Sequence, residues 1–197
     1  GYEEVHGIAV DANSDVLVAG NYAGAGDFGG GPVSSVGSSN DIFVAKFLGS
    51  SGAPVWSRVP GSTGDDRAYS VAVDSNGNTI LTGSYNGVLD FGGGLLPYTG
   101  GGADIFLAKY LTNGSHAWSK GFGSSSPDSD VGKAVAVDPS GNVFLTGSAI
   151  NAVNFGGSTM FGIGGQDVYL AKFSGTGTHL WSKRFAATYT NEGSALA

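Results

Sequence analysis

The sequence predicts an all-β fold built from small, repeated four-stranded antiparallel sheets. Short runs rich in Val, Ile, Phe and Trp alternate with clusters of Gly, Asn, Asp and Ser, the same succession of four runs occurs three times, and no run shows a helical period of useful length. Gly occupies 36 of 197 positions without a strict triplet period, which excludes a collagen-like chain. A hydrophobic share of 41% is enough to bury a core.

An internal repeat of about 63 residues organises the chain. Four motifs occur once in each unit. Ala9-Val10-Asp11 returns at 72–74 and 136–138, and Asp27-Phe28-Gly29-Gly30 returns at 90–93 and, with Asn in place of Asp, at 154–157. Asp41–Lys46 returns at 104–109 and 167–172, and Trp56-Ser57-Arg58 returns at 118–120 and 181–183, with Lys in place of Arg. Ala195-Leu196-Ala197 matches Gly7-Ile8-Ala9, so we expect the start of a fourth unit there.

Each unit is expected to hold four strands, which in the first unit are 7–11, 16–22, 41–48 and 54–59. In the third of these, Phe43 and Ala45 face one way while Ile42 and Val44 face the other. Both faces are therefore apolar, and the sheet must be covered on both sides. Four-stranded sheets stacked around an axis meet this requirement, which predicts a β-propeller.

We expect one partial propeller over residues 1–197, with blades at about 7–61, 70–124 and 134–187 and the start of a fourth at 194–197. Three blades would leave the outer faces of the first and last blades uncovered, which marks Ile8, Val10 and Leu196 as interface candidates. Their expected partners are further blades of the same chain or other copies of it, two copies giving a six-bladed ring and more giving an open array.

The repeat motifs resemble the SBBP-type repeats of the bacterial seven-bladed β-propeller family, and the resemblance extends over essentially the whole chain. The matching strings are DIFVAKF at 41–47, DFGGG at 90–94, VAVD at 135–138, PSGN at 139–142, VFLTGS at 143–148 and HLWSKRF at 179–185. The resemblance implies a propeller fold and a secreted or cell-surface bacterial protein, but no common activity. Three units and a stub depart from the family's closed ring, which needs at least four blades.

Charge and composition exclude several classes of protein. The formal net charge is −7, the isoelectric point is about 4.6 and only nine residues are Lys or Arg, so the electrostatic footprint of a nucleic-acid binder is absent. No apolar run approaches the roughly 20 residues of a membrane-spanning helix, so we expect no membrane insertion. The chain has no Cys, which excludes disulfides and thiolate metal sites.

Acidic residues gather in the connections expected at one end of the sheets, where loops on a rigid scaffold commonly bind ligands. This acidic loop face has two interpretations: a ring of carboxylates that binds Ca²⁺ or a cationic partner, or a solvated rim whose Asp side chains cap turns. Its candidate residues are Asp27, Asp65, Asp66, Asp90, Asp128 and Asp130, with Glu3, Glu4, Asp41, Asp104, Asp167 and Glu192 nearby in sequence.

The other motifs indicate structure more than chemistry. The Asp74–Asn78 segment resembles the opening of a calcium loop but lacks the later bidentate Glu and fits a tight turn. One Trp per unit, at 56, 118 and 181, fits packing between blades better than sugar stacking. His116 and His179 hold equivalent places without a zinc-ligand spacing, and no Ser has a His partner that the sequence identifies.

The sequence therefore predicts a non-catalytic extracellular module for adhesion or for recognition of a glycan or protein. A self-assembling structural protein, whose blades pack between chains into a ring, tube or fibre, is the alternative. A propeller hydrolase is a third reading, which would need a cluster that breaks the symmetry of the repeat.

Overall fold

The computed structural model describes residues 1–197 apart from 99, 125–126, 128, 164, 186–192 and 197. The described residues form strands and turns without any helix, so the all-β prediction is confirmed, and none of them belongs to a helix that could cross a membrane. The predictions for Asp128, Glu192 and Ala197, and the end of the expected third blade at 186–187, lie outside the described residues.

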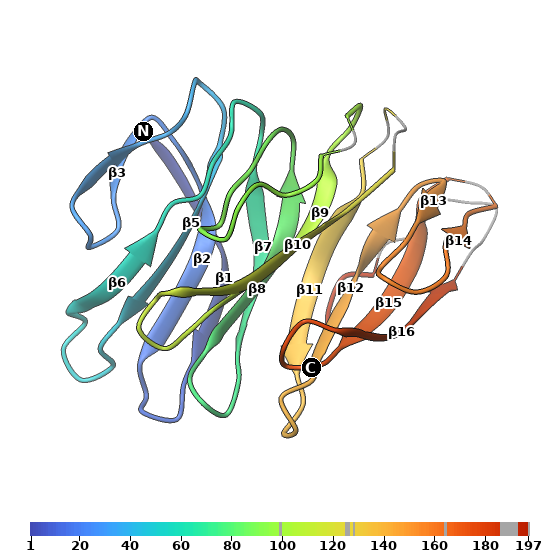
Figure 1. Ribbon diagram of the computed structural model, residues 1–197. Coiled ribbons are helices and arrows are strands. Elements are labelled where there is room, and N and C mark those ends of the chain that lie inside the picture. The colour runs from blue at the N-terminus through green and yellow to red at the C-terminus, as the bar shows by residue number, and fades with distance from the viewer. Residues whose placement is uncertain (99, 125–126, 128, 164, 186–192, 197) are drawn as a thin grey trace.

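Three four-stranded antiparallel sheets follow one another along the chain and stand side by side (Figure 1). The first sheet consists of β1 (Tyr2–Val10), β2 (Val16–Ala23), β5 (Asp41–Phe47) and β6 (Pro54–Arg58). The second consists of β7 (Arg67–Val73), β8 (Thr79–Tyr85), β9 (Asp104–Tyr110) and β10 (His116–Phe122). The third consists of β11 (Val131–Val137), β12 (Val143–Ala149), β15 (Asp167–Phe173) and β16 (His179–Phe185).

The strand bounds agree with the sequence prediction except at the ends. The first strand begins at Tyr2 instead of residue 7, because Tyr2 to Val5 continue the ladder with Gly20 to Ala23. Two short hairpins were not predicted, β3 (Ala25–Asp27) with β4 (Pro32–Ser34) and β13 (Ala152–Val153) with β14 (Met160–Phe161). Both lie in the connection between the second and third strands of a sheet.

The register of each sheet repeats, irregularities included. The first strand of every sheet carries a register shift at the same point, between Val5 and Gly7, between Ala68 and Ser70, and between Gly132 and Ala134. Such a bulge bends the strand and increases its twist. The sequence repeat is thus also a repeat of backbone geometry.

Two hydrophobic clusters join the three sheets. In β9, Phe106 and Ala108 belong to the cluster shared with the first sheet, whereas Ile105 and Leu107 belong to the cluster shared with the third. The second sheet is therefore covered on both faces, as the two apolar faces of its third strand predict. We call the face of each sheet toward the next sheet its forward face and the opposite one its rear face.

The innermost strands β1, β7 and β11 approach one another closely. A Cβ atom on Gly7 would lie 2.9 Å from the backbone nitrogen of Val71, and the Val135 N–H donates to Ser70 Oγ at 3.2 Å. Gly7 and Ser70 are small residues, which permits this approach.

The rear face of the first sheet and the forward face of the third have no neighbouring sheet. Ile8 and Val10 are 68% and 56% exposed, whereas Val71 and Val135, the counterparts of Ile8, are 8% and 5% exposed. Leu196 lies half-buried on the forward face of the third sheet. Burial by the preceding sheet accounts for the difference between Ile8 and its counterparts.

Candidate functional site

The repeated Trp residues fasten each sheet to the next. The Trp56 indole N–H donates to the carbonyl of Thr112 at 3.0 Å, and Trp118 donates to the carbonyl of Gly175 at 3.1 Å. Each acceptor lies in the turn between the third and fourth strands of the following sheet. The packing role that the sequence favoured for these two residues agrees with this geometry, and Trp181, which has no following sheet, is 38% exposed.

A Lys–Asp ion pair recurs on the forward face of every sheet. Lys46 Nζ lies 2.7 Å from Asp11 Oδ2 with both side chains almost fully buried, and the pair of Lys109 with Asp74 is similar at 2.8 Å. Burial alone would lower the pKa of Lys46, but hydrogen bonds to Asp11 and Asp15 raise it overall. Lys46 and its partner Asp11 are therefore both charged inside the protein.

The segments that resemble calcium loops are tight turns. Asp74 Oδ1 accepts the backbone N–H groups of Asn76 and Asn78, both at 2.9 Å, while its Oδ2 faces Lys109. Asp11 and Asp138 make equivalent bonds in the other two sheets. Because a Lys ammonium and two backbone N–H groups already bind the carboxylate oxygens, the turn interpretation holds for these segments.

Only some carboxyl groups of the acidic loop face are exposed to solvent. Asp66, Asp130 and Asp167 are fully buried, and Asp41 and Asp104 are almost so, which corrects the expectation that these carboxyls lie on an exposed rim. Burial raises the pKa of Asp130 to about 6, although the Ile150 N–H opposes the shift. The same cause raises the pKa of Asp41 to about 6, with the nearby Asp66 adding to it.

The buried carboxyl groups accept hydrogen bonds from the loops at this end of the sheets and stabilise them. Asp66 accepts the backbone N–H groups of Ser62 at 2.6 Å and Asn86 at 2.9 Å, and Asp130 accepts that of Ile150 at 2.7 Å. In the second and third sheets, a bond from the loop after the second strand thus connects that loop to the entry into the sheet.

The exposed candidates cap turns or pair with a neighbour. Asp27 accepts the N–H groups of Gly29 and Gly31, and Asp90 accepts those of Gly92 and Gly94. Asp65 pairs with Arg67 at 2.7 Å. Among the described residues, no group of three or more His, Asp or Glu side chains is arranged to hold a metal ion.

The structure pairs each repeat His with a Ser that the sequence did not single out. His116 Nε2 lies 3.1 Å from Ser119 Oγ, and His179 Nε2 lies 3.2 Å from Ser182 Oγ. The sequence identified no His partner for a Ser, and the structure places one beside each of these two Ser residues. Within the described part of the chain, neither ring lies within 4 Å of a carboxylate, so the acid that would orient the base of a hydrolytic triad is missing.

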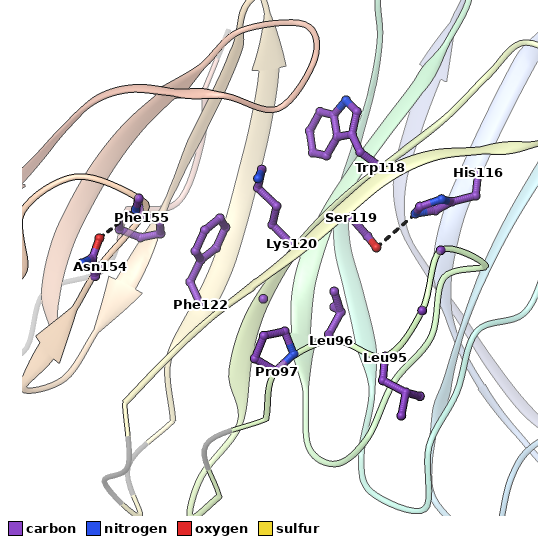
Figure 2. Close-up of a pocket in the computed structure, with 14 residues that line it drawn as sticks. Leu95, Leu96, Pro97, His116, Trp118, Ser119, Lys120, Phe122, Asn154 and Phe155 are labelled. Carbon is purple, nitrogen blue, oxygen red and sulfur yellow. Dashed lines mark hydrogen bonds between the residues drawn. The ribbon is translucent and has the colours of Figure 1, made fainter.

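An open groove of about 660 Å³ runs along the outer strand β10 at the rim between the second and third sheets (Figure 2). Leu95 and Pro97 line it on one side of the strand, and Trp118, Lys120 and Asn154 on the other. The groove thus combines apolar and aromatic surface with a cation and a carboxamide. Sequence reasoning missed it because it depends on two adjacent sheets.

A part of the chain matches a protein family model. Residues 117–155 match the family model of the SBBP beta-propeller repeat. This stretch of the chain is similar to one SBBP repeat. The matched SBBP stretch begins in β10 of the second sheet and ends just after β13 of the third, so it spans the junction that Trp118 and the second cluster hold together. No curated protein matches the chain.

Proposed function

We propose that the three sheets are successive blades of a β-propeller, with blades at about 7–61, 70–124 and 134–187 and a fourth beginning at 194–197. The SBBP match and the two equivalent junctions support this assignment. The environment of Gly193 supports the fourth blade. A Cβ atom there would lie 2.5 Å from Thr146 Oγ1 and 3.2 Å from the Gly147 carbonyl oxygen, and one on Gly132 would meet Thr82 and Gly83 in the same way.

We further propose that the chain is a non-catalytic module, outside the cell or on its surface, that recognises a glycan or a protein as part of a larger chain. The groove along β10 is the observation that carries this proposal. Leu95, Pro97 and the part of Trp118 that lines the groove offer apolar surface to a sugar ring, while Lys120 and Asn154 offer polar groups to hydroxyl or carboxylate substituents.

Titration calorimetry with neutral hexose oligomers and with uronic-acid oligomers tests glycan recognition. We expect binding by the wild-type chain, weaker binding by Lys120→Ala, and unchanged binding by Lys183→Ala, which alters the equivalent position on the third sheet. Equal affinities of the two variants would place the ligand elsewhere. Absence of any binding to either probe would remove the glycan form of the proposal and leave protein recognition.

A non-catalytic role also predicts how the Ser–His pairs behave. Hydrolysis of nitrophenyl esters by the wild-type chain and by Ser119→Ala should be equally slow, because the imidazole of His116 lacks an orienting carboxylate. A rate that falls sharply in Ser119→Ala would favour a hydrolase instead.

The self-assembling structural protein is the second candidate, and the two uncovered end faces favour it. Electron microscopy of the purified chain separates the candidates. Discrete particles support a recognition module, and continuous rings, tubes or fibres support a structural protein.

A further inference from the structure

A smaller groove at the junction of the first and second sheets is the counterpart of the groove along β10. Its volume is about 240 Å³, and the residues of its lining include Arg58, Val59, Asp90 and Phe91. The same positions of the repeat line the groove along β10, where they hold Lys120, Gly121, Asn154 and Phe155. The two grooves are therefore one feature of the repeat, with different side chains at three of these four positions.

The two grooves differ in charge. The lining of the first groove holds one cation, Arg58, and one carboxylate, Asp90. Among the described residues that line the groove along β10, Lys120 is accompanied by no Asp or Glu, because Asn154 stands where Asp90 stands in the preceding sheet. In a chain with a net charge of −7, this groove is thus a local region of positive charge. Such a region attracts an anionic ligand.

The change from Asp to Asn alters this charge but keeps the turn. Asp90 Oδ1 accepts the N–H of Gly92 at 2.7 Å, and Asn154 Oδ1 accepts the N–H of Gly156, also at 2.7 Å. Both glycines have a positive φ, 107° and 111°. The carboxamide therefore caps the turn as the carboxylate does. Its Nδ2, which contacts Thr159 Oγ1 at 3.4 Å, adds N–H donors at the exposed edge of the groove.

The two cations also differ in what they contact. Arg58 Nη1 donates to the carbonyl of Ser57 at 2.6 Å, so this guanidinium already has a partner in its own sheet. The Lys residues of the third strands each pair with an Asp, whereas no carboxylate of the described residues lies within 4 Å of Lys120 Nζ. A Cβ atom on Gly177 would lie 3.1 Å from Lys120 Cε, so the aliphatic chain packs beside a turn of the third sheet. The ammonium of Lys120 is therefore held at the groove and can accept an anion.

The groove along β10 is also larger, at about 660 Å³ against about 240 Å³. Gly121 contributes to this difference, because it has no side chain where Val59 lines the first groove. A Cβ atom on Gly121 would lie 3.1 Å from the carbonyl oxygen of Pro97, so the loop on one side of the groove approaches β10 closely. Sites for small ligands commonly have volumes of about 300 to 1,000 Å³, a range that includes this groove but not the first one.

We propose that the groove along β10 binds an acidic glycan, with the carboxylate of a uronic acid held by Lys120 and with Asn154 as the residue that makes the groove selective for it. The proposal rests on the recognition function proposed above and names the class of its ligand. A charge-assisted hydrogen bond from the ammonium to the carboxylate is about twice as strong as one to a hydroxyl group.

The polar groups around Lys120 favour an acidic sugar over an acidic peptide. His116 Nε2 and Ser119 Oγ, 3.1 Å apart, line the groove together with Asn154 and can exchange hydrogen bonds with ring hydroxyls (Figure 2). Leu95 and Pro97 supply apolar surface for the ring itself. A run of acidic side chains would need several cations, whereas the described lining holds one Lys and no Arg.

Titration calorimetry with two forms of one oligosaccharide tests the proposal. The probes are a hexamer of galacturonic acid and its fully methyl-esterified form, which has the same sugar rings without the charge. The acidic hexamer should bind about tenfold more tightly than the ester. This difference should shrink between about 0.05 M and 0.5 M NaCl, because salt screens an exposed charge pair.

A matched pair of variants locates the selectivity. Asn154→Asp restores the carboxylate of the first groove and should weaken binding of the acidic hexamer about tenfold, while binding of the ester stays unchanged. Asn113→Asp adds the same charge to another turn, where Asn113 Oδ1 accepts the N–H of Ser115 at 3.0 Å, and should change neither affinity. Binding of the acidic hexamer by Asn154→Asp as tight as that of the wild type would overturn the proposal.

The outcomes separate this inference from the recognition function itself. Equal affinities for the two hexamers, both reduced in Lys120→Ala, would refute selection by charge and leave glycan recognition in the groove. Absence of binding to either hexamer would refute the acidic glycan and glycan recognition together. Hexaglutamate that binds in place of the hexamers, and binds more weakly to Asn154→Asp, would transfer the groove to recognition of an acidic protein segment.

Discussion

Replacement of Lys46 by Met tests how strongly burial by the next sheet changes the contribution of a repeated ion pair to the free energy of unfolding. Lys46 and Asp11 are 2.7 Å apart with side chains 3% and 1% exposed, beneath the second sheet. Lys172 and Asp138 hold the same positions in the third sheet, which has no following sheet, and are 3.3 Å apart and 21% and 26% exposed. Lys172→Met is therefore a matched control that differs in burial.

The expected effects follow from the cost of leaving a charge without a partner. Removing one member of a buried pair costs about 3 to 5 kcal/mol, because the remaining ion stays out of water, whereas a partly exposed pair contributes about 0 to 1 kcal/mol. Asp15, 3.3 Å from Lys46 Nζ, also loses its partner in Lys46→Met. We therefore expect Lys46→Met to lower the free energy of unfolding at neutral pH by at least about 2 kcal/mol more than Lys172→Met does.

The pH dependence of stability is an independent check, because its sign should differ between the wild type and Lys46→Met. Burial opposes ionisation of Asp11, but hydrogen bonds from Lys46 and from the backbone of Asp15 and Asn13 lower its pKa overall. A lowered pKa in the folded state contributes stability above the unfolded value of about 3.9, and this contribution is lost as the pH falls through the folded value. Without Lys46, burial dominates and raises the pKa of Asp11, so the variant should lose stability as the pH rises above about 4.

Urea unfolding of the wild type, the two Lys variants and the double variant Asp11→Asn with Lys46→Met provides the measurement. The double variant removes both charges and keeps a side-chain oxygen for the turn, so it should recover most of the loss caused by Lys46→Met alone. If the Lys46 and Lys172 variants lose equal stability, or if the double variant recovers nothing, the argument from burial is refuted.

Three further results are expected. Gly114→Ala should cost about 2 kcal/mol or more, because the new methyl group meets Trp56 and the φ is positive, whereas Gly52→Ala should cost about 1 kcal/mol from the backbone alone, both measured by urea unfolding. Burial raises the pKa of Asp130 to about 6, so its ionisation should cost the wild type about 2 to 3 kcal/mol of stability as the pH rises from about 4 to about 7. Asp130→Asn should show a smaller loss over this range in urea unfolding. Millimolar Ca²⁺ should leave the melting temperature unchanged, because turn amides already occupy the exposed carboxylates, and a rise would point to a metal site on the acidic loop face.

The sequence alone was sufficient for the all-β class and the repeated four-stranded sheets because its evidence is periodic. The alternation of Ile42 and Val44 with Phe43 and Ala45 predicts a sheet covered on both faces, and the recurrence of each motif predicts three such sheets. The short hairpins after the second strand escaped prediction because β3 and β13 have two or three residues each, too few for a pattern.

The site was less accessible to sequence reasoning because it depends on contacts between repeats. Asp66 and Asp130 were placed on an exposed rim, since a charged residue in a Gly-rich connection is usually solvated. Burial in the structure comes from the backbone amides of Ser62, Asn86 and Ile150, which replace water around the carboxyl groups. The joint recurrence of Lys46 with Asp11 in every unit was a visible signal of the ion pair, but it does not reveal which face the pair occupies.

The polar contacts between sheets explain how nearly identical surfaces pack in one register. Apolar burial is proportional to area and has little direction, so two sheets could slide along each other at small cost. Hydrogen bonds remove this freedom: Trp118 Nε1 and Lys109 Nζ both donate to the single carbonyl of Gly175, each at 3.1 Å. A shift by one residue would remove this acceptor from the half-buried Trp118 indole N–H and from the Lys109 ammonium, which would keep only Asp74, and an unsatisfied buried donor costs about 1 to 3 kcal/mol. The indole and the ammonium thus select the register that the hydrophobic clusters then stabilise, and the same two groups, Trp181 and Lys172, are present on the free forward face.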